Sequence, residues 1–222
     1  MASRLRYSPL LSAPRRLAKK ALVPIIYRHR PTGLRGLRLY AYLDAIIQTN
    51  KLHGAVVEIG AATCGTAIEG LSTLKQLGSK REYVCIDTFT GYVPEQFDED
   101  IRRGLKRSWR RTLYSSNDLA LVQSILRVHH ATDIRLVQAD ICTYDDLPET
   151  ISMCLLDVNL YAPTLAGLDK VWPRLEPGGI ILVDDCGDGL DWQARQGLAE
   201  FCEKMELPFR REWSDVGFIT KQ

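Results

Sequence analysis

The sequence lacks the features that define several large classes of protein. No apolar stretch approaches the roughly 18 uncharged residues that a membrane-spanning helix needs, so we expect no integral membrane segment. An uninterrupted apolar segment after the first basic residues is also lacking, which argues against a secretory signal. No Cys-x-x-Cys pair occurs, so neither a zinc nor a redox motif is indicated. A reducing cytoplasm is the simplest expectation for the six scattered cysteines: Cys64, Cys85, Cys142, Cys154, Cys186 and Cys202.

Acidic residues are absent from the first 38 positions, which carry ten lysines and arginines. Since the whole chain has 29 basic and 27 acidic residues, the remainder has 19 basic and 27 acidic residues, a balance of −8. This asymmetry predicts a basic helical extension or cap over residues 1–50 and a separate domain over 51–222. Pro31-Thr32-Gly33 is the clearest linker between the arm and the core.

Residues 14–28 have the pattern of a basic amphipathic helix, which Pro24 interrupts. Four interpretations are open: peripheral contact with a membrane surface, a transit peptide, a cap over the core, or a short helix packed on the domain with its cations in water. The apolar residues of this segment need a surface to pack against, so we expect it to close over the active site or to mediate assembly: Leu17, Ala21, Ile25 and Ile26.

Short apolar runs alternate with helical patterns from residue 55 onward. Runs that are apolar throughout are typical of strands buried on both faces of a parallel sheet, and we expect strands at 55–60, 83–87, 134–139, 153–157, 179–184, 209–213 and 216–220. Helices are expected at 66–77, 98–113, 117–130, 163–175 and 191–205. This order predicts a doubly wound α/β sandwich.

The last two expected strands are separated only by Ser214 and Asp215, which is too short for a parallel crossover. They must therefore pair as an antiparallel hairpin. By fold analogy, a mainly parallel seven-stranded sheet that ends in such a hairpin is the Rossmann-like class I methyltransferase plan rather than a dehydrogenase or flavodoxin plan.

Acidic residues stand at the carboxyl ends of five expected strands. In an open parallel sheet that edge is where ligands bind, although any single acid there also serves as a helix N-cap. The first strand runs into a turn with Gly60 and Gly65, which is neither Gly-x-Gly-x-x-Gly nor a phosphate-binding loop. A ligand without a pyrophosphate is therefore favoured. The acids are Glu58, Asp87, Asp140, Asp157, Asp184 and Asp185.

Four segments resemble the macrocin O-methyltransferase family, whose members methylate sugar hydroxyls with S-adenosylmethionine and magnesium. The resemblance covers roughly residues 55–190, and its second half is the more specific part. The segments are VEIG at 57–60 with Gly65, IDTFTGYVP at 86–94, LDVNLYAPT at 156–164 and LEPGGIILVDD at 175–185.

The resemblance implies both a cofactor site and a metal site. Mg²⁺ or Mn²⁺ would be held by Asp157, Asp184 and Asp185, and carboxylate oxygens are the ligands that hard cations take. Three carboxylates close together would also repel one another without a cation. The residues expected to bind S-adenosylmethionine are Glu58, Gly60, Ala61, Gly65, Thr66, Asp87, Thr88, Asp140, Ile141 and Asp157.

Two positions depart from the family pattern. Family members often have a second aspartate two residues after the first, where it can act as general base, but this chain has Asn159, whose amide cannot take a proton. The catalytic candidates are Asp157, Asn159 and His130. The missing base would be replaced by a metal that lowers the pKa of the acceptor hydroxyl, or by assistance from His130, Asp140 or Asp188. Cys64 stands where the family often has glycine.

The substrate side is expected to involve Tyr92, Asn159, Tyr161 and Trp109. Residues 98–113 predict a helix with a cationic face, because Arg102, Lys106 and Arg110 recur at every fourth position. Such a face would attract an anionic or polyhydroxylated substrate, or simply be solvated.

The favoured function is methyl transfer to a hydroxyl of a sugar or oligosaccharide, such as a polysaccharide precursor or a glycosylated natural product. Methylation of a catechol or other phenol is the first alternative, and a cofactor-binding scaffold without catalysis is the second. We expect a small-molecule or oligosaccharide acceptor, no nucleic-acid partner and a homodimer in the cytoplasm.

Overall fold

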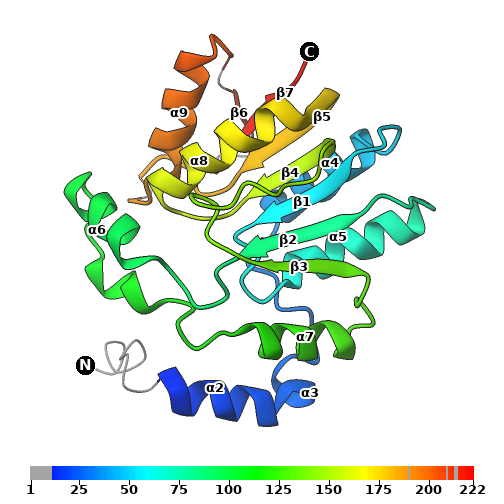
Figure 1. The fold of residues 1–222 in the computed structure, drawn as a ribbon, viewed down its shortest axis with the longest axis vertical. Coiled ribbons are helices and arrows are strands. Elements are labelled where there is room, and N and C mark those ends of the chain that lie inside the picture. Colours follow the sequence, from blue (N-terminus) through cyan, green and yellow to red (C-terminus); the bar gives the residue numbers. More distant parts are fainter. Residues whose placement is uncertain (1–11, 190, 209, 213–214) are drawn as a thin grey trace.

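The computed structural model describes residues 12–189, 191–208, 210–212 and 215–222. One sheet of seven strands forms its centre, in the order β3-β2-β1-β4-β5-β7-β6 (Figure 1). The strands are β1 Ala55–Ile59, β2 Tyr83–Asp87, β3 Ile134–Gln138, β4 Ile151–Leu156, β5 Leu175–Val183, β6 Arg210–Glu212 and β7 Val216–Thr220.

The first five strands pair in parallel, whereas β7 runs antiparallel to both β5 and β6. This confirms the predicted fold class, a mainly parallel Rossmann-like sheet that ends in an antiparallel hairpin. Phe209 and Trp213, at the ends of the predicted sixth strand, and Ser214 in the predicted turn lie outside the described residues. So do residues 1–11 of the predicted N-terminal extension.

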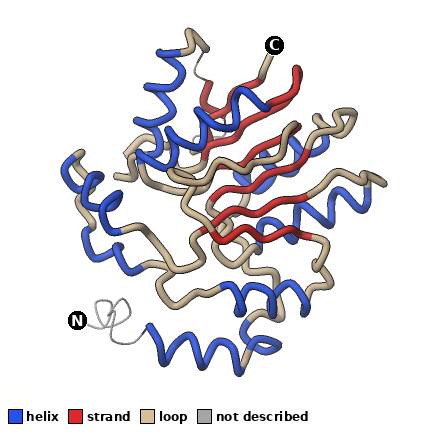
Figure 2. Tube along the Cα trace, in the orientation of Figure 1, coloured by secondary structure: helices blue, strands red, loops and turns tan. Residues whose placement is uncertain are grey.

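Helices cover both faces of the sheet (Figure 2). Alternate residues of β1 point to opposite faces, so Val56 joins one core cluster and Val57 the other. The first cluster packs beneath α4 Leu37–Gln48, α5 Gly65–Gln76 and α7 Leu119–Val128, and the second beneath α8 Tyr161–Val171 and α9 Ala194–Lys204. The 3-10 helix η3 Trp172–Arg174 joins α8 to β5.

The prediction of one helix over 98–113 is wrong, because this segment belongs to two separate helices. Helix α6 covers Pro94–Arg102, and a separate 3-10 helix, η2, covers Ser108–Thr112. Gly104 between them has a φ of +113°, a conformation that continues no right-handed helix. The expected cationic face therefore does not form, and its arginines have different partners: Arg110 packs over the ring of Trp192.

The basic segment forms α2 Ser12–Ala21 and α3 Val23–Ile26, with the break just before Pro24. Both helices lie against α7, where Lys20 and Arg16 pair with Asp118. The cations of α2 thus face the domain. Apolar side chains of both helices turn outward: Leu17 of α2 is 70% exposed and Ile25 of α3 is 69% exposed. The expected packing of these apolar side chains is not made within the described chain.

Helix α4 lies within the residues expected to form the extension, yet it shares the core of the sandwich. Tyr42, Ala45 and Ile46 of α4 are fully buried, and α4 packs on α5 and β4. Within the part of the chain that the structure describes, no helix is both long and apolar enough to cross a membrane.

Asp118 joins the arm to the domain and also caps α7, since its Oδ1 accepts from the Leu121 N–H at 2.8 Å. We predict that Asp118→Ala lowers the free energy of unfolding by about 1–2 kcal/mol, because it removes an N-cap and two partly exposed ion pairs. Asp118→Asn keeps a capping oxygen and should lose less. Urea denaturation measures both, and equal losses in the two variants would contradict a capping role.

Candidate active site

A pocket of about 930 Å³, open mouth included, lies at the carboxyl edge of the sheet where β1 and β4 are neighbours. The residues after β1, β2, β3 and β4 line it, joined by Pro31 and Gly33 from the predicted linker. A ligand site is expected where the strand order reverses. All the predicted cofactor-binding residues line this pocket: Glu58, Gly60, Ala61, Gly65, Thr66, Asp87, Thr88, Asp140, Ile141 and Asp157.

Backbone hydrogen bonds extend the sheet one residue past the strand ends and so fix the edge of the pocket. Gly60 N donates to Ile86 O at 2.9 Å, Asp157 N to Ile59 O at 2.8 Å, and Asp184 N to Leu156 O at 2.9 Å. Gly60 has a φ of +92°, and a Cβ there would lie 2.1 Å from the Asp157 carbonyl oxygen. Glycine is therefore required for β1 and β4 to end this close together.

Asp87 organises the loops that follow β1 and β2. Its Oδ2 accepts from Ala62 N at 2.9 Å and its Oδ1 from Phe89 N at 2.6 Å. Burial raises the pKa of Asp87, and these backbone hydrogen bonds partly offset that effect. Each carboxylate oxygen has a second lone pair, so Asp87 can still accept hydrogen bonds from a ligand in the pocket.

Glu58 belongs to a buried polar network as well as to the pocket wall. Tyr83 Oη donates to its Oε2 at 2.7 Å, and Tyr42 Oη is hydrogen-bonded to Tyr83 Oη. Burial raises the pKa of Glu58 to about 8, although the hydrogen bond from Tyr83 favours the ionised form. A positively charged group of a ligand would therefore stabilise the glutamate as the carboxylate.

The charge of the pocket wall has one sign. Glu58, Asp87, Asp140 and Asp157 line it, and its described lining residues include no lysine or arginine. Asp140 is held in place by Cys142 N at 3.0 Å and by the Gln96 side chain of α6 at 2.7 Å. Such a wall suits a cationic or hydroxyl-bearing ligand and is unsuited to a pyrophosphate.

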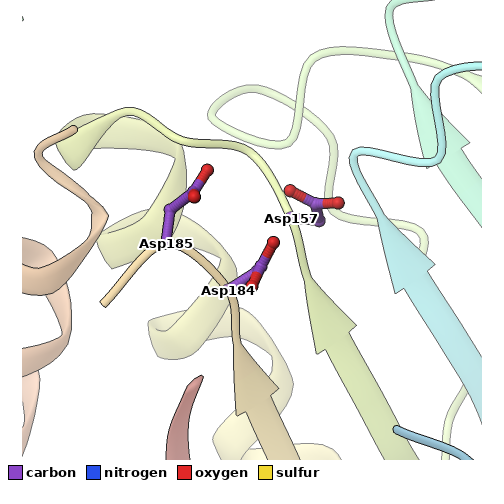
Figure 3. Close-up of side chains that lie close together, drawn as sticks. All are labelled: Asp157, Asp184 and Asp185. Carbon is purple, nitrogen blue, oxygen red and sulfur yellow. The ribbon is translucent and has the colours of Figure 1, made fainter. Parts of the chain in front are cut away.

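Three aspartates meet beside this pocket, at the ends of β4 and β5 (Figure 3). Asp157, Asp184 and Asp185 each offer a carboxylate oxygen, and these oxygens lie within 4.8 Å of one another. Burial, followed by the charges of Asp184 and Asp185, raises the pKa of Asp157 well above its usual range. Burial and the charge of Asp184 raise the pKa of Asp185 to about 6. The cluster predicted from the sequence is thus assembled.

Sequence reasoning missed the cation that faces this cluster. Arg38, in the first turn of α4, donates from Nη1 to Asp184 Oδ2 at 2.7 Å and lies 3.8 Å from Asp185 Oδ1. Asp184 is 3% exposed, and its other oxygen, Oδ1, is buried with no hydrogen-bond partner. Arg38 is separated from Asp184 by 146 residues, and no local pattern in the sequence links the two.

Asn159 connects the cluster to the aromatic side of the pocket. Its backbone is left-handed, with a φ of +63°, a conformation that asparagine tolerates better than most residues. Its Nδ2 donates to Asp185 Oδ2, and its Oδ1 accepts from Tyr92 Oη at 2.7 Å. Tyr92 packs in turn against Trp192 and Tyr114, and Tyr114 also lines the pocket.

Three of the predicted functional residues lie away from the pocket. Tyr161 is 8% exposed, and its hydroxyl donates to Glu200 of α9. Trp109 in η2 is 48% exposed and does not line the pocket. His130 follows α7 and precedes β3, so it lies at the amino edge of the sheet, opposite the pocket. The structure therefore brings together only Tyr92 and Asn159 among the predicted substrate residues.

The strand order and the acid-lined pocket at the ends of β1 and β4 define an S-adenosylmethionine-dependent methyltransferase fold. The chain belongs to the macrocin O-methyltransferase (TylF) family, whose model matches residues 29–211. It is accordingly an O-methyltransferase, and the resemblance seen in the sequence is confirmed.

One similar curated protein is 8-demethyl-8-(2,3-dimethoxy-alpha-L-rhamnosyl)-tetracenomycin-C 4'-O-methyltransferase of Streptomyces olivaceus. It is 24% identical over 183 residues, which are 78% of this chain and 70% of the relative. The O-methyltransferase NovP has a TM-score of 0.73 at 18% identity, over 83% of this chain and 79% of NovP. The calicheamicin methyltransferase CalS11 has a TM-score of 0.66 at 20% identity, over 94% and 91% of the two chains. The two structures share the fold.

The close contact at Gly60 can be tested against a second glycine. We predict that Gly60→Ala lowers the free energy of unfolding by at least about 3 kcal/mol, because the new Cβ would meet the Asp157 backbone. Gly78 also has a positive φ, but a Cβ there meets nothing within 4 Å, so Gly78→Ala should cost on the order of 1–2 kcal/mol. Equal losses in urea denaturation would refute the steric explanation.

Proposed function

We propose that this chain transfers the methyl group of S-adenosylmethionine to a hydroxyl of a sugar or oligosaccharide, with Mg²⁺ or Mn²⁺ held by three aspartates. One observation carries the proposal: Asp157 belongs both to the wall of the cofactor pocket and to the aspartate cluster. A methyl donor in the pocket and a hydroxyl at the cluster would therefore be neighbours. Holding two reactants together supplies a large part of the barrier reduction in such transfers.

The pocket fits S-adenosylmethionine by the chemistry of its donor and acceptor groups. The cofactor carries a sulfonium and an amino group, both positive, and a ribose with two hydroxyls. Acidic residues without a neighbouring lysine or arginine complement these groups. Asp87, at the end of β2, is the side chain we assign to the ribose hydroxyls.

The aspartate cluster fits a hard divalent cation. Its three carboxylates offer oxygen ligands at two adjacent strand ends, and the buried Asp184 Oδ1 has no other partner. A cation bound there would supply Lewis-acid polarisation of an acceptor hydroxyl and lower its pKa.

The other candidate residues are poorly placed or unable to remove the proton of the acceptor hydroxyl. Asn159 has no capacity to accept a proton, and its amide is held between Asp185 and Tyr92, so it would orient the acceptor. His130 lies at the opposite edge of the sheet, and Asp188 is an exposed partner of Arg195. Asp140 lines the pocket but is held by Gln96. This geometry favours activation of the hydroxyl at the aspartate cluster over a separate histidine base.

The sugar acceptor is supported by the relatives and by the aromatic wall. The Streptomyces olivaceus relative is named for a rhamnosyl 4'-O-methylation, and CalS11 is described as a TDP-rhamnose 3'-O-methyltransferase. Tyr92 and Tyr114 line the pocket beside Asn159 and offer ring faces for a sugar. A catechol or phenol acceptor would use the same faces, so it is the alternative; a cofactor-binding scaffold without turnover is the second.

We also propose that the protein works as a homodimer in the cytoplasm on a small-molecule or oligosaccharide acceptor. The outward apolar side chains of α2 and α3, including Leu17 and Ile25, give the surface that a second copy would cover. Peripheral contact with a membrane is the alternative use of that surface.

The ribose assignment predicts that Asp87→Ala weakens S-adenosylmethionine binding by at least about tenfold, since hydrogen bonds to a charged group contribute about 1.5–3 kcal/mol each. Asp87→Asn keeps the shape of the side chain and should lie between that variant and the wild type. Asp133→Ala, an exposed acid just before β3, is the control. Calorimetric titration measures the three affinities, and equal affinity of Asp87→Ala and wild type would refute the assignment.

The metal and acceptor assignments are tested together by mass spectrometry of a mixed sugar and phenol panel with S-adenosylmethionine. We predict methylated sugars with Mg²⁺ or Mn²⁺ and none in excess chelator. Asp184→Asn and Asp185→Asn should lose at least about 100-fold in turnover, because polarisation by the metal is worth several kcal/mol.

The matched control is Asp188→Asn, a nearby exposed acid that pairs with Arg195 and should keep full turnover. Full turnover in excess chelator would reject the metal. Methylated phenols without methylated sugars would establish the first alternative, and no product with any acceptor would favour the scaffold.

A further inference from the structure

The aspartate cluster already has a positive charge supplied by the chain itself. Arg38 Nη1 is 2.7 Å from Asp184 Oδ2 and 3.8 Å from Asp185 Oδ1, so one guanidinium serves two of the three carboxylates. Arg38 also favours the ionised form of Asp157, which means that its charge acts on the whole cluster. An arginine keeps its charge at every accessible pH, and only a movement of its side chain can withdraw that charge.

The position of Arg38 leaves room for such a movement. Its helix, α4, is fixed by the fully buried Tyr42, Ala45 and Ile46, so the backbone of Arg38 is anchored. Its side chain is 28% exposed, whereas that of Asp184 is 4% exposed. The long arginine side chain thus reaches the buried carboxylate from a partly solvent-exposed position, and it is not itself part of the core.

Arg38 and a divalent cation would compete for the same carboxylates. Arg38 takes Oδ2 of Asp184 and leaves Oδ1 of the same residue without a partner. A cation at the cluster would therefore lie within a few ångströms of the guanidinium, and like charges at that separation repel strongly in a partly buried site. Either the arginine retreats or the cation binds less tightly than three free carboxylates would allow.

We propose that Arg38 is a resident counterion of the aspartate cluster, which neutralises Asp184 and Asp185 while the metal is absent and lowers the affinity of the cluster for a divalent cation. This inference rests on the proposed metal site and names the residue that tunes it. Arg38 is a positioning residue in this account, because it acts through the aspartates. Its consequence is a site that stays folded without metal and exchanges its metal readily.

Arg38→Gln tests the proposal through metal binding itself. We expect this variant to bind Mn²⁺ at least about tenfold more tightly than wild type, because a repelling charge is removed from the site. The free-Mn²⁺ electron paramagnetic resonance signal measures this affinity without substrate or turnover. Arg38→Lys keeps the charge and should remain close to wild type. Arg35→Gln removes an exposed cation three residues earlier and is the matched control.

Thermal unfolding gives a second test. Arg38→Gln is expected to strengthen Mn²⁺ binding but to lower the melting temperature of the metal-free protein. Without metal, Arg38→Gln should melt below wild type, because Asp184 and Asp185 lose their counterion, and saturating Mn²⁺ should close that gap. A side chain with a purely structural role would lower the melting temperature equally with and without metal.

The outcomes distinguish a failure of the proposed metal site from a failure of the role given to Arg38. Absence of Mn²⁺ binding to both wild type and Arg38→Gln would reject the metal site itself. Binding to wild type that is unchanged or weaker in Arg38→Gln would leave the metal site standing and overturn the role given to Arg38.

Discussion

Mutual repulsion of carboxylates at one edge of a parallel sheet is the constraint on which the rest of this structure depends. Parallel strands end together, so acids that follow them are brought into one partly buried space where their charges are costly. The chain offsets that cost with backbone N–H groups at Asp87, with an amide at Asn159 and with the guanidinium of Arg38. The pocket keeps its acidic character because these partners leave some oxygen lone pairs free for a ligand.

The loops that carry these acids turn sharply, and besides Gly60 they use left-handed residues that are not glycine. A residue with a positive φ follows each of four strands: Ala62 after β1, Phe89 after β2, Asn159 after β4 and Asp185 after β5. Left-handed residues of this kind cost free energy and are concentrated where function needs a fixed side-chain direction. Cys64 also has a φ of +57°, a conformation that glycine adopts without steric cost.

The sheet and the pocket could be predicted from the sequence, because buried parallel strands are apolar throughout and their ends face one edge. The break in the predicted helix and the contacts between residues far apart in the sequence could not be predicted. The spacing of the arginines favoured one helix over 98–113, but Gly104 ends it, a local conformation that outweighs the periodicity. Arg38 was missed because its contact with Asp184 exists only after α4 packs on the sheet. Tyr161 stands in a motif that resembles the family, yet its ring turns to Arg103 and Glu200.

The segment between the basic arm and α4 is part of the pocket wall. Pro31 and Gly33 line the pocket, Thr32 Oγ1 is hydrogen-bonded to Thr66 Oγ1 at 2.9 Å, and a Cβ on Gly65 would lie 2.2 Å from the Pro31 backbone. The wall on this side is therefore held at both ends, by α2 and α3 docked on α7 and by α4 in the core. Only residues 27–30 separate the end of α3 from Pro31, so a displacement of the arm from α7 would act directly on this side of the pocket.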